Sequence, residues 1–147
     1  MLTDKWEASG YMDECLIDTD ILSFYLKGDQ AVKTKVKEYL FVKGFERLNI
    51  SEITYYEIKA GLEHRRARQQ IRQFEEFSTE CRILKLTKNS LDITANRYGK
   101  LKRQGIDIGT PDLMVAGIAI DNNLVLVTNN LEHFRPVEGL RITNWKQ

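Results

Sequence analysis

Two aspartates, Asp18 and Asp20, follow the short apolar run Leu16–Ile17 in the segment ECLIDTDILSFYL. Open parallel sheets bind their ligands beyond the carboxyl ends of their strands, so a carboxylate at this place can do chemistry. A helix beginning here offers another explanation, because Asp18 or Thr19 could be its N-cap and Asp20 would interact favourably with the helix dipole. The dipole accounts for Asp20. A capping Thr19 would leave Asp18 unexplained, so Asp18 is the stronger candidate for chemistry.

Glu57 lies on the face of a predicted helix that also carries Ile53, Ala60 and Gly61, a spacing typical of a packed face. An unpaired charge on such a face is costly. Glu57 is therefore expected either to form a salt bridge with a nearby Lys or Arg or to bind a cation.

Asp112 lies in the segment GTPDLMVAGIAI, where Thr110 is the predicted N-cap of a helix and Asp112 falls in its first turn. The helix dipole alone could explain an acid there. Asp112 also shares a face with Ala116 and Ala119, and the small Ala116 and Gly117 would let this helix approach the sheet closely. We therefore expect Asp112 to point inward, over the strand ends.

Asp18, Glu57 and Asp112 would repel one another at one end of a sheet unless a cation lay among them. Ligands that are all oxygen favour a hard ion, Mg²⁺ or alternatively Mn²⁺. His64 and His133 are expected to be surface or core residues outside the metal site. A cation held by carboxylates can bind a phosphate oxygen and activate water, which is the chemistry of phosphodiester hydrolysis.

The elements that must position these residues are short β-branched runs alternating with stretches of helical periodicity. Helical stripes begin at Val32, Ile71 and Leu91. Strands separated by helices predict an α/β fold, a three-layer α/β/α domain with a short parallel sheet. The predicted strands are Cys15–Ile17, Leu48–Ile50, Arg82–Leu86, Leu124–Val127 and Leu140–Thr143.

Length and composition predict one globular domain, since the chain has 147 residues, 42% of them hydrophobic, and a net charge of +1. No apolar stretch is long enough to span a membrane, and the N-terminus has no export signal, so we expect a cytoplasmic protein with no membrane contact. Cys15 and Cys81 lack metal-ligand spacing and are expected to be buried and reduced.

A basic run, HRRARQQIR, extends from His64 to Arg72. Such a run is often the solvated face of a helix. Beside an acidic catalytic centre it could instead hold the phosphates of RNA, so Arg65, Arg66 and Arg68 are candidate RNA-binding residues.

Four segments together resemble the motifs of PIN-domain ribonucleases, in particular the VapC-type toxins of bacterial VapBC toxin–antitoxin modules. They are LIDTDIL, ISEITYYEIKAGL, TPDLMVAGIAI and LVLVTNNLEHF. The resemblance implies catalytic roles for Asp18, Glu57, Asp112 and the turn from Thr128 to Asn130, the three acids being the metal ligands. It extends from Met12 to Trp145 and places one PIN-like domain at residues 12–147, with residues 1–11 as an N-terminal extension.

The resemblance implies a Mg²⁺-dependent endoribonuclease that cleaves structured RNA such as tRNA or rRNA and is neutralised by a VapB-like antitoxin. It also implies a homodimer. Tyr55, Tyr56, Leu62 and Phe24 could form an apolar docking surface for the antitoxin, or they could equally belong to the core.

Two other functions stay open. The Asp18-Thr19-Asp20 spacing also resembles haloacid-dehalogenase-type phosphatases, in which the first Asp is the nucleophile. That family expects Thr or Val where Leu22 stands, and an acidic pair where Asp112 has no acidic neighbour. Alternatively, Asn129 and Asn130, at a place where some PIN enzymes have an aspartate, could mark a non-catalytic scaffold that binds RNA or protein.

Overall fold

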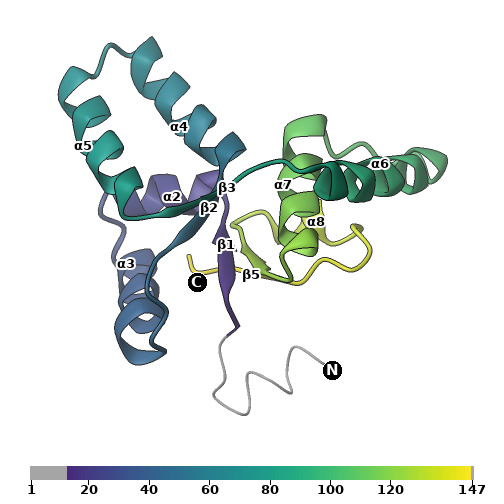
Figure 1. The fold of residues 1–147 in the computed structure, drawn as a ribbon, viewed down its shortest axis with the longest axis horizontal. Coiled ribbons are helices and arrows are strands. Elements are labelled where there is room, and N and C mark those ends of the chain that lie inside the picture. The colour runs from purple at the N-terminus through teal and green to yellow at the C-terminus, as the bar shows by residue number, and fades with distance from the viewer. Residues whose placement is uncertain (1–12, 147) are drawn as a thin grey trace.

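Five parallel strands form one sheet in the order β3-β2-β1-β4-β5 in this computed structural model, which describes residues 13–146 (Figure 1). The predicted extension, residues 1–11, lies outside the described residues. All five predicted strands are confirmed: β1 has the predicted bounds, β2 begins and ends one residue later than predicted, and the other three are shorter. They are β1 Cys15–Ile17, β2 Asn49–Ser51, β3 Arg82–Leu84, β4 Val125–Val127 and β5 Ile142–Thr143.

Helices connect and cover these strands. The π-helix η1, Glu38–Val42, continues directly from the end of α3. The α-helices are α2 Thr19–Leu26, α3 Gln30–Lys37, α4 Glu52–His64, α5 Arg68–Thr79, α6 Lys88–Arg103, α7 Thr110–Asp121 and α8 Leu131–Phe134.

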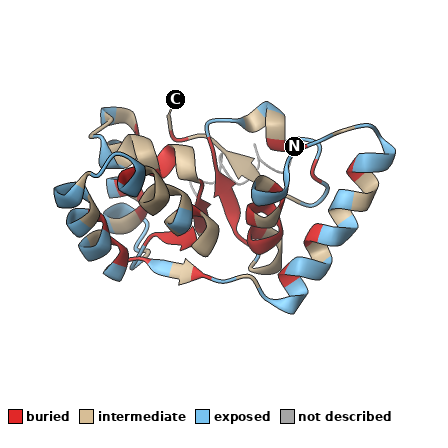
Figure 2. Ribbon diagram, turned by 90° about the horizontal axis from the view of Figure 1, so that it is seen from above, coloured by how far each residue is buried: buried red, intermediate tan, exposed pale blue. Residues whose placement is uncertain are grey.

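The sheet separates two hydrophobic clusters, which confirms the predicted three-layer α/β/α fold. Successive strand side chains point to opposite faces, so Cys15 and Ile17 of β1 join one cluster and Leu16 joins the other. Helices α2 to α5 lie on the first side, and α6 and α7 lie on the second (Figure 1). The strands between them are mostly buried (Figure 2).

Three of the four residues that were predicted either to form a docking surface or to belong to the core lie in or against the first cluster. Leu62 is buried, and Phe24 and Tyr55 pack against the cluster, so these three residues belong to the core. Tyr56, by contrast, is 70% exposed. The two cysteines are buried and free, as predicted.

Helix α7 packs against α6 through Gly117, which corrects its predicted role. A Cβ at Gly117 would lie 2.1 Å from Thr94 Oγ1 and 2.9 Å from the Ser90 carbonyl oxygen, both on α6. The missing side chain therefore allows contact between two helices and not, as expected, between a helix and the sheet. The N-cap of α7 is Gly109, with φ 93°, and not Thr110, because a left-handed residue ends the preceding loop.

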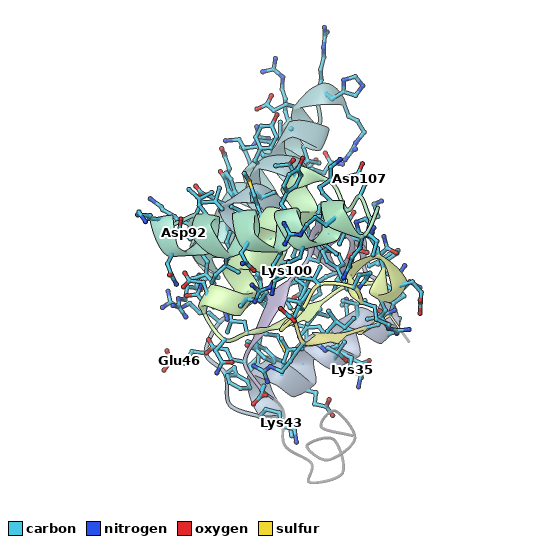
Figure 3. The ribbon with its side chains drawn as sticks, turned by 90° about the vertical axis from the view of Figure 1, so that its right-hand side faces the viewer. Lys35, Lys43, Glu46, Asp92, Lys100 and Asp107 are labelled. Atoms are coloured by element: carbon cyan, nitrogen blue, oxygen red, sulfur yellow. The ribbon has the colours of Figure 1, made fainter. Side chains whose placement is uncertain are left out.

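Helix α6 forms the outer layer on the second side. Figure 3 labels Asp92 and Lys100 on this helix. Lys100 pairs with Glu138 at 2.6 Å, and the exposed Asp92 pairs with Lys88 at 3.0 Å. Within residues 13–146, no helix combines the length and the apolarity that crossing a membrane requires.

The central strand β1 pairs with β2 on one edge and with β4 on the other, so the strand order reverses at β1. Such a switch point leaves a crevice at the carboxyl ends of the strands, which is where open α/β sheets bind ligands. Asp18 follows β1 and Thr128 follows β4 at this place. The fold therefore brings together two segments that are far apart in sequence.

Candidate active site

Asp18 lies at the switch point and is 7% exposed. Its Oδ1 accepts a hydrogen bond of 2.9 Å from the Thr19 amide, so of the two predicted alternatives Asp18, and not Thr19, is the N-cap of α2. Its Oδ2 accepts a hydrogen bond of 2.9 Å from the Thr128 hydroxyl. Capping uses one of the two oxygens, so it does not remove Asp18 from the candidate site.

Burial raises the pKa of Asp18 from 3.8 to about 7, and the negative charges of Asp20 and, less strongly, Asp112 add to the effect. The hydrogen bonds from Thr19 and Thr128 lower the pKa but do not offset the burial. Across residues 13–146, Asp18 forms no ion pair with a basic side chain. A cation would supply the missing positive charge.

Asp20 does more than interact with the helix dipole, because its side chain also contacts the turn after β4. Its Oδ1 accepts from the Ile21 amide at 2.7 Å, and its Oδ2 accepts from the Asn129 amide at 3.0 Å. The second bond crosses from α2 to the turn after β4. The pKa of Asp20 is raised, mainly by burial and also by the charge of Asp112.

Glu57 reaches the site from α4 through Thr19. Ser51 caps this helix by accepting from the Thr54 amide at 3.0 Å, which directs α4 away from the end of β2. Glu57 Oε1 accepts a hydrogen bond of 2.6 Å from the Thr19 hydroxyl, which also lies 2.9 Å from the Thr54 hydroxyl. In the described part of the chain no Lys or Arg forms a salt bridge with Glu57.

Asp112 lies in the first turn of α7, as predicted. It contacts His133, which was expected to lie outside the metal site. Its Oδ2 lies 2.9 Å from His133 Nε2. The His133 ring also packs edge-on against Phe134, with centroids 5.1 Å apart, so the ring is held from two sides. The sequence could have indicated a role for His133, because it follows the polar end of β4 by a few residues. Its partner, Asp112, lies 21 positions earlier in the chain, where no local pattern points to it.

Thr128 and Asn130 differ in burial and in bonding. The Thr128 hydroxyl is fully buried, donates to Asp18, and accepts from the Asn130 amide at 3.1 Å. Thr128 is therefore built to position Asp18. Asn130 is exposed and precedes α8, but its side chain makes no capping hydrogen bond. The side-chain amide oxygen of Asn130 is therefore available at the surface.

The donor chemistry of these residues suits a hard divalent cation. Asp18, Glu57 and Asp112 offer carboxylate oxygens from three elements, and Asn130 adds an amide oxygen. Among residues 13–146, however, no three Asp, Glu, His or Cys side chains are arranged so that they could hold a metal ion together. The carboxylate and amide oxygens and the buried Asp18 without a basic partner in the described chain are what a hard divalent cation would require.

The candidate RNA-binding arginines lie at the turn between α4 and α5, at one extremity of the molecule (Figure 1). Arg65 folds back along α4 toward Gly61, whereas Arg66 adopts a left-handed backbone with φ 55°. Arg66, Arg68 and Arg72 line a cavity of about 330 Å³ together with Glu63 and Ile71. Arg65 lies eight positions after Glu57, which corresponds to roughly 12 Å along a helix.

Comparison with known proteins assigns the family. The PIN domain family matches residues 15–139, which include every candidate acidic residue. The tRNA(fMet)-specific endonuclease VapC of Salmonella typhimurium is 30% identical over 131 residues, covering 88% of this chain and 96% of that protein. The ribonuclease VapC1 of Haemophilus influenzae is 30% identical over 135 residues, with the same coverage of both chains.

Solved structures agree with this assignment. The DNA-bound VapBC of Salmonella typhimurium superposes with a TM-score of 0.80 at 29% identity, covering 91% of this chain and 99% of that one. VapBC-1 of Haemophilus influenzae gives a TM-score of 0.79 at 28% identity, covering 90% and 98%. The chain therefore belongs to the PIN-domain family, among the VapC-type ribonucleases.

Proposed function

We propose that this protein is a divalent-cation-dependent endoribonuclease, the toxin of a VapBC-type module, with Mg²⁺ as its ion and Mn²⁺ as a substitute. One observation carries the proposal. The buried Asp18 lies at the switch point of the sheet, within electrostatic reach of Asp20 and Asp112, and it forms no ion pair with a basic side chain of the described chain. This arrangement is stable at neutral pH if a cation occupies it.

Asp18, Asp112 and Glu57 would hold the cation. Such a cation would supply polarisation of a phosphate oxygen and a lower pKa for the attacking water. Hydrolysis forms a bond between the water oxygen and phosphorus and breaks one phosphorus–oxygen ester bond. Thr128 fixes Asp18, Thr19 fixes Glu57, and His133 fixes Asp112, so a hydrogen bond orients each acid before RNA arrives.

Structured RNA, tRNA or rRNA, is the proposed substrate class. The name of the Salmonella typhimurium relative specifies a tRNA, which supports this choice. The cavity lined by Arg66, Arg68 and Arg72 could receive a backbone phosphate of the same RNA molecule. The arginines would then contribute to affinity, while the acids carry out the cleavage.

A VapB-like antitoxin is the proposed partner, a homodimer the proposed assembly, and the cytoplasm the proposed location. The structural relatives from Salmonella typhimurium and Haemophilus influenzae are VapBC complexes, which supports the first proposal. The exposed Tyr56, on the same helix as Glu57, is the remaining candidate from the predicted apolar docking surface.

Inducing the protein without its genetic neighbour, and mapping new RNA 5′ ends across the transcriptome, tests the substrate class. The purified protein should cleave the RNA identified in this way when Mg²⁺ is present and should stop when EDTA removes it. Asp18→Asn, Glu57→Gln and Asp112→Asn should each reduce cleavage by at least a hundredfold while circular dichroism stays unchanged.

The same experiment separates the alternatives. The family assignment already leaves the phosphatase reading without support, and trapping of a phospho-aspartate at Asp18 would be required to restore it. A non-catalytic scaffold would bind RNA and show no metal-dependent cleavage. Wild-type turnover by one of the three variants, free of contaminating nuclease, would remove that residue from the site.

A further inference from the structure

Asp20 is an acid that the proposed mechanism leaves without a role. It lies in the first turn of α2, two residues beyond Asp18. Its carboxylate bridges two segments, because one oxygen accepts from the Ile21 amide at 2.7 Å and the other accepts from the Asn129 amide at 3.0 Å. The bridge places a negative charge at the backbone of the turn that follows β4.

The turn that receives this charge has no acidic side chain of its own. Asn129 and Asn130 are both neutral, and both are exposed. Asn129 Oδ1 accepts a hydrogen bond of 3.0 Å from the Asn144 side chain, so that amide is already engaged. Any negative charge at this side of the site must therefore come from another element.

The geometry links Asp20 to Asp18 through two paths. Asp20 lies in the first turn of the helix that Asp18 caps, and it accepts from the Asn129 amide in the turn whose Thr128 hydroxyl donates to Asp18 Oδ2. Both of its hydrogen-bond donors are neutral backbone amides, and in the described chain Asp20 forms no salt bridge. Each carboxylate oxygen has a second lone pair that these bonds leave free.

We propose that Asp20 supplies the fourth negative charge of the cation site, in the place where an acidic residue at position 130 would otherwise supply it. The proposal rests on the proposed function, since it concerns the same cation. The charged side chain belongs to α2, and the hydrogen bond from the Asn129 amide holds it beside the turn. Asp20 attracts the cation and holds its water, while Asn130 contributes a neutral oxygen.

Moving the charge between the two positions tests this proposal. Asp20→Asn removes the charge and keeps one of the two acceptor oxygens, so it should raise the Mg²⁺ concentration for half-maximal cleavage about tenfold. Asn130→Asp should lower that concentration. The double variant Asp20→Asn/Asn130→Asp, which restores four negative charges, should return to within about threefold of wild type.

Cation binding without RNA provides a second readout. Calorimetric titration with Mn²⁺ alone should show the same order of affinities for the RNA-free protein. Asp92→Asn, which removes an exposed acid on the outer face of α6, is the matched control and should leave the Mn²⁺ affinity unchanged (Figure 3).

The outcomes separate the two proposals. Cleavage by wild type together with an unchanged Mg²⁺ requirement in Asp20→Asn would overturn the role of Asp20 and leave the nuclease intact. Absence of cleavage by wild type would overturn the nuclease, and the Mn²⁺ titration would still decide whether Asp20 contributes to a cation site. If Asp20→Asn fails to fold, Asp20→Glu should bind Mn²⁺ more tightly than Asp20→Gln, and equal affinities would overturn the proposal.

Discussion

The Thr128 hydroxyl donates a hydrogen bond of 2.9 Å to Asp18 Oδ2 and thereby joins the ends of β4 and β1, 110 residues apart in sequence. Both side chains are buried, and the same hydroxyl accepts from the Asn130 amide. One oxygen atom thus orients the proposed cation ligand and also shapes the turn that carries Asn129 and Asn130.

Thr128→Val should lower the free energy of unfolding by about 1–3 kcal/mol, because it leaves the buried Asp18 carboxylate and the Asn130 amide without this hydrogen-bond partner. The bond lowers the pKa of Asp18, so its loss should also move the acidic limb of the pH–rate profile to higher pH. Urea unfolding and cleavage rates between pH 5.5 and 8.5 measure both effects. Thr128→Ser, which keeps the hydroxyl, is the control, and equal pH profiles for Val and Ser would contradict this role.

The raised pKa of Asp18 predicts that the cation-free protein loses stability as pH rises from about 4 to 7. In that range the folded carboxyl keeps a proton that the unfolded chain releases, so rising pH favours unfolding. Asp18→Asn, which carries no charge, should be more stable than wild type at pH 7.5, by on the order of 2 kcal/mol. Denaturation in EDTA at pH 5 and pH 7.5 measures the difference. A stability gap that does not grow with pH would show that Asp18 is ionised without a penalty.

His133→Ala should weaken binding of Mg²⁺, because Asp112 loses the hydrogen bond that orients its carboxylate. We expect a tenfold or larger increase in the Mg²⁺ concentration for half-maximal cleavage, with little change in RNA affinity. His133→Gln can still donate a hydrogen bond and should recover part of the loss. Equal defects in the Ala and Gln variants would assign His133 to packing against Phe134 instead.

Replacing Arg65, Arg66 and Arg68 with Ala should weaken RNA binding and flatten the slope of log affinity against log salt, because fewer counterions are released. Replacing Lys37, Lys102 and Arg103, which are exposed elsewhere on the molecule, removes the same charge and is the matched control. Mn²⁺ affinity should be unchanged in both triple variants. Equal slopes in the two variants would return the arginine run to an ordinary solvated surface.

Gly117→Ala should destabilise the protein by about 1–3 kcal/mol, because the new methyl group would overlap Thr94 Oγ1 and the Ser90 carbonyl oxygen. Gly99→Ala on α6 should do the opposite and add up to about 1 kcal/mol, since its Cβ would meet just the flexible Arg103 side chain, at 3.4 Å. Thermal unfolding of both variants tests the contrast. A stable Gly117→Ala protein would show that α6 and α7 can separate without cost.

The sequence by itself determined the strands, the α/β/α layers and the acidic residues at the strand ends. The periodicity of apolar residues indicates which side of an element is buried. Because each strand is short, a few apolar residues are enough to indicate it. The sequence could not determine the partners of the acids. Thr128 with Asp18, Asn129 with Asp20 and His133 with Asp112 are pairs separated by 110, 109 and 21 residues.

The tertiary structure decided those partners because they depend on the strand order, which places β4 and β2 on either side of β1. It also decided that Gly117 faces α6, since the small residues of α7 could have packed on either neighbour. A hydrogen bond requires two atoms within about 3 Å of each other. Local sequence patterns fix which side of an element is buried, whereas the packing of whole elements fixes which atoms meet.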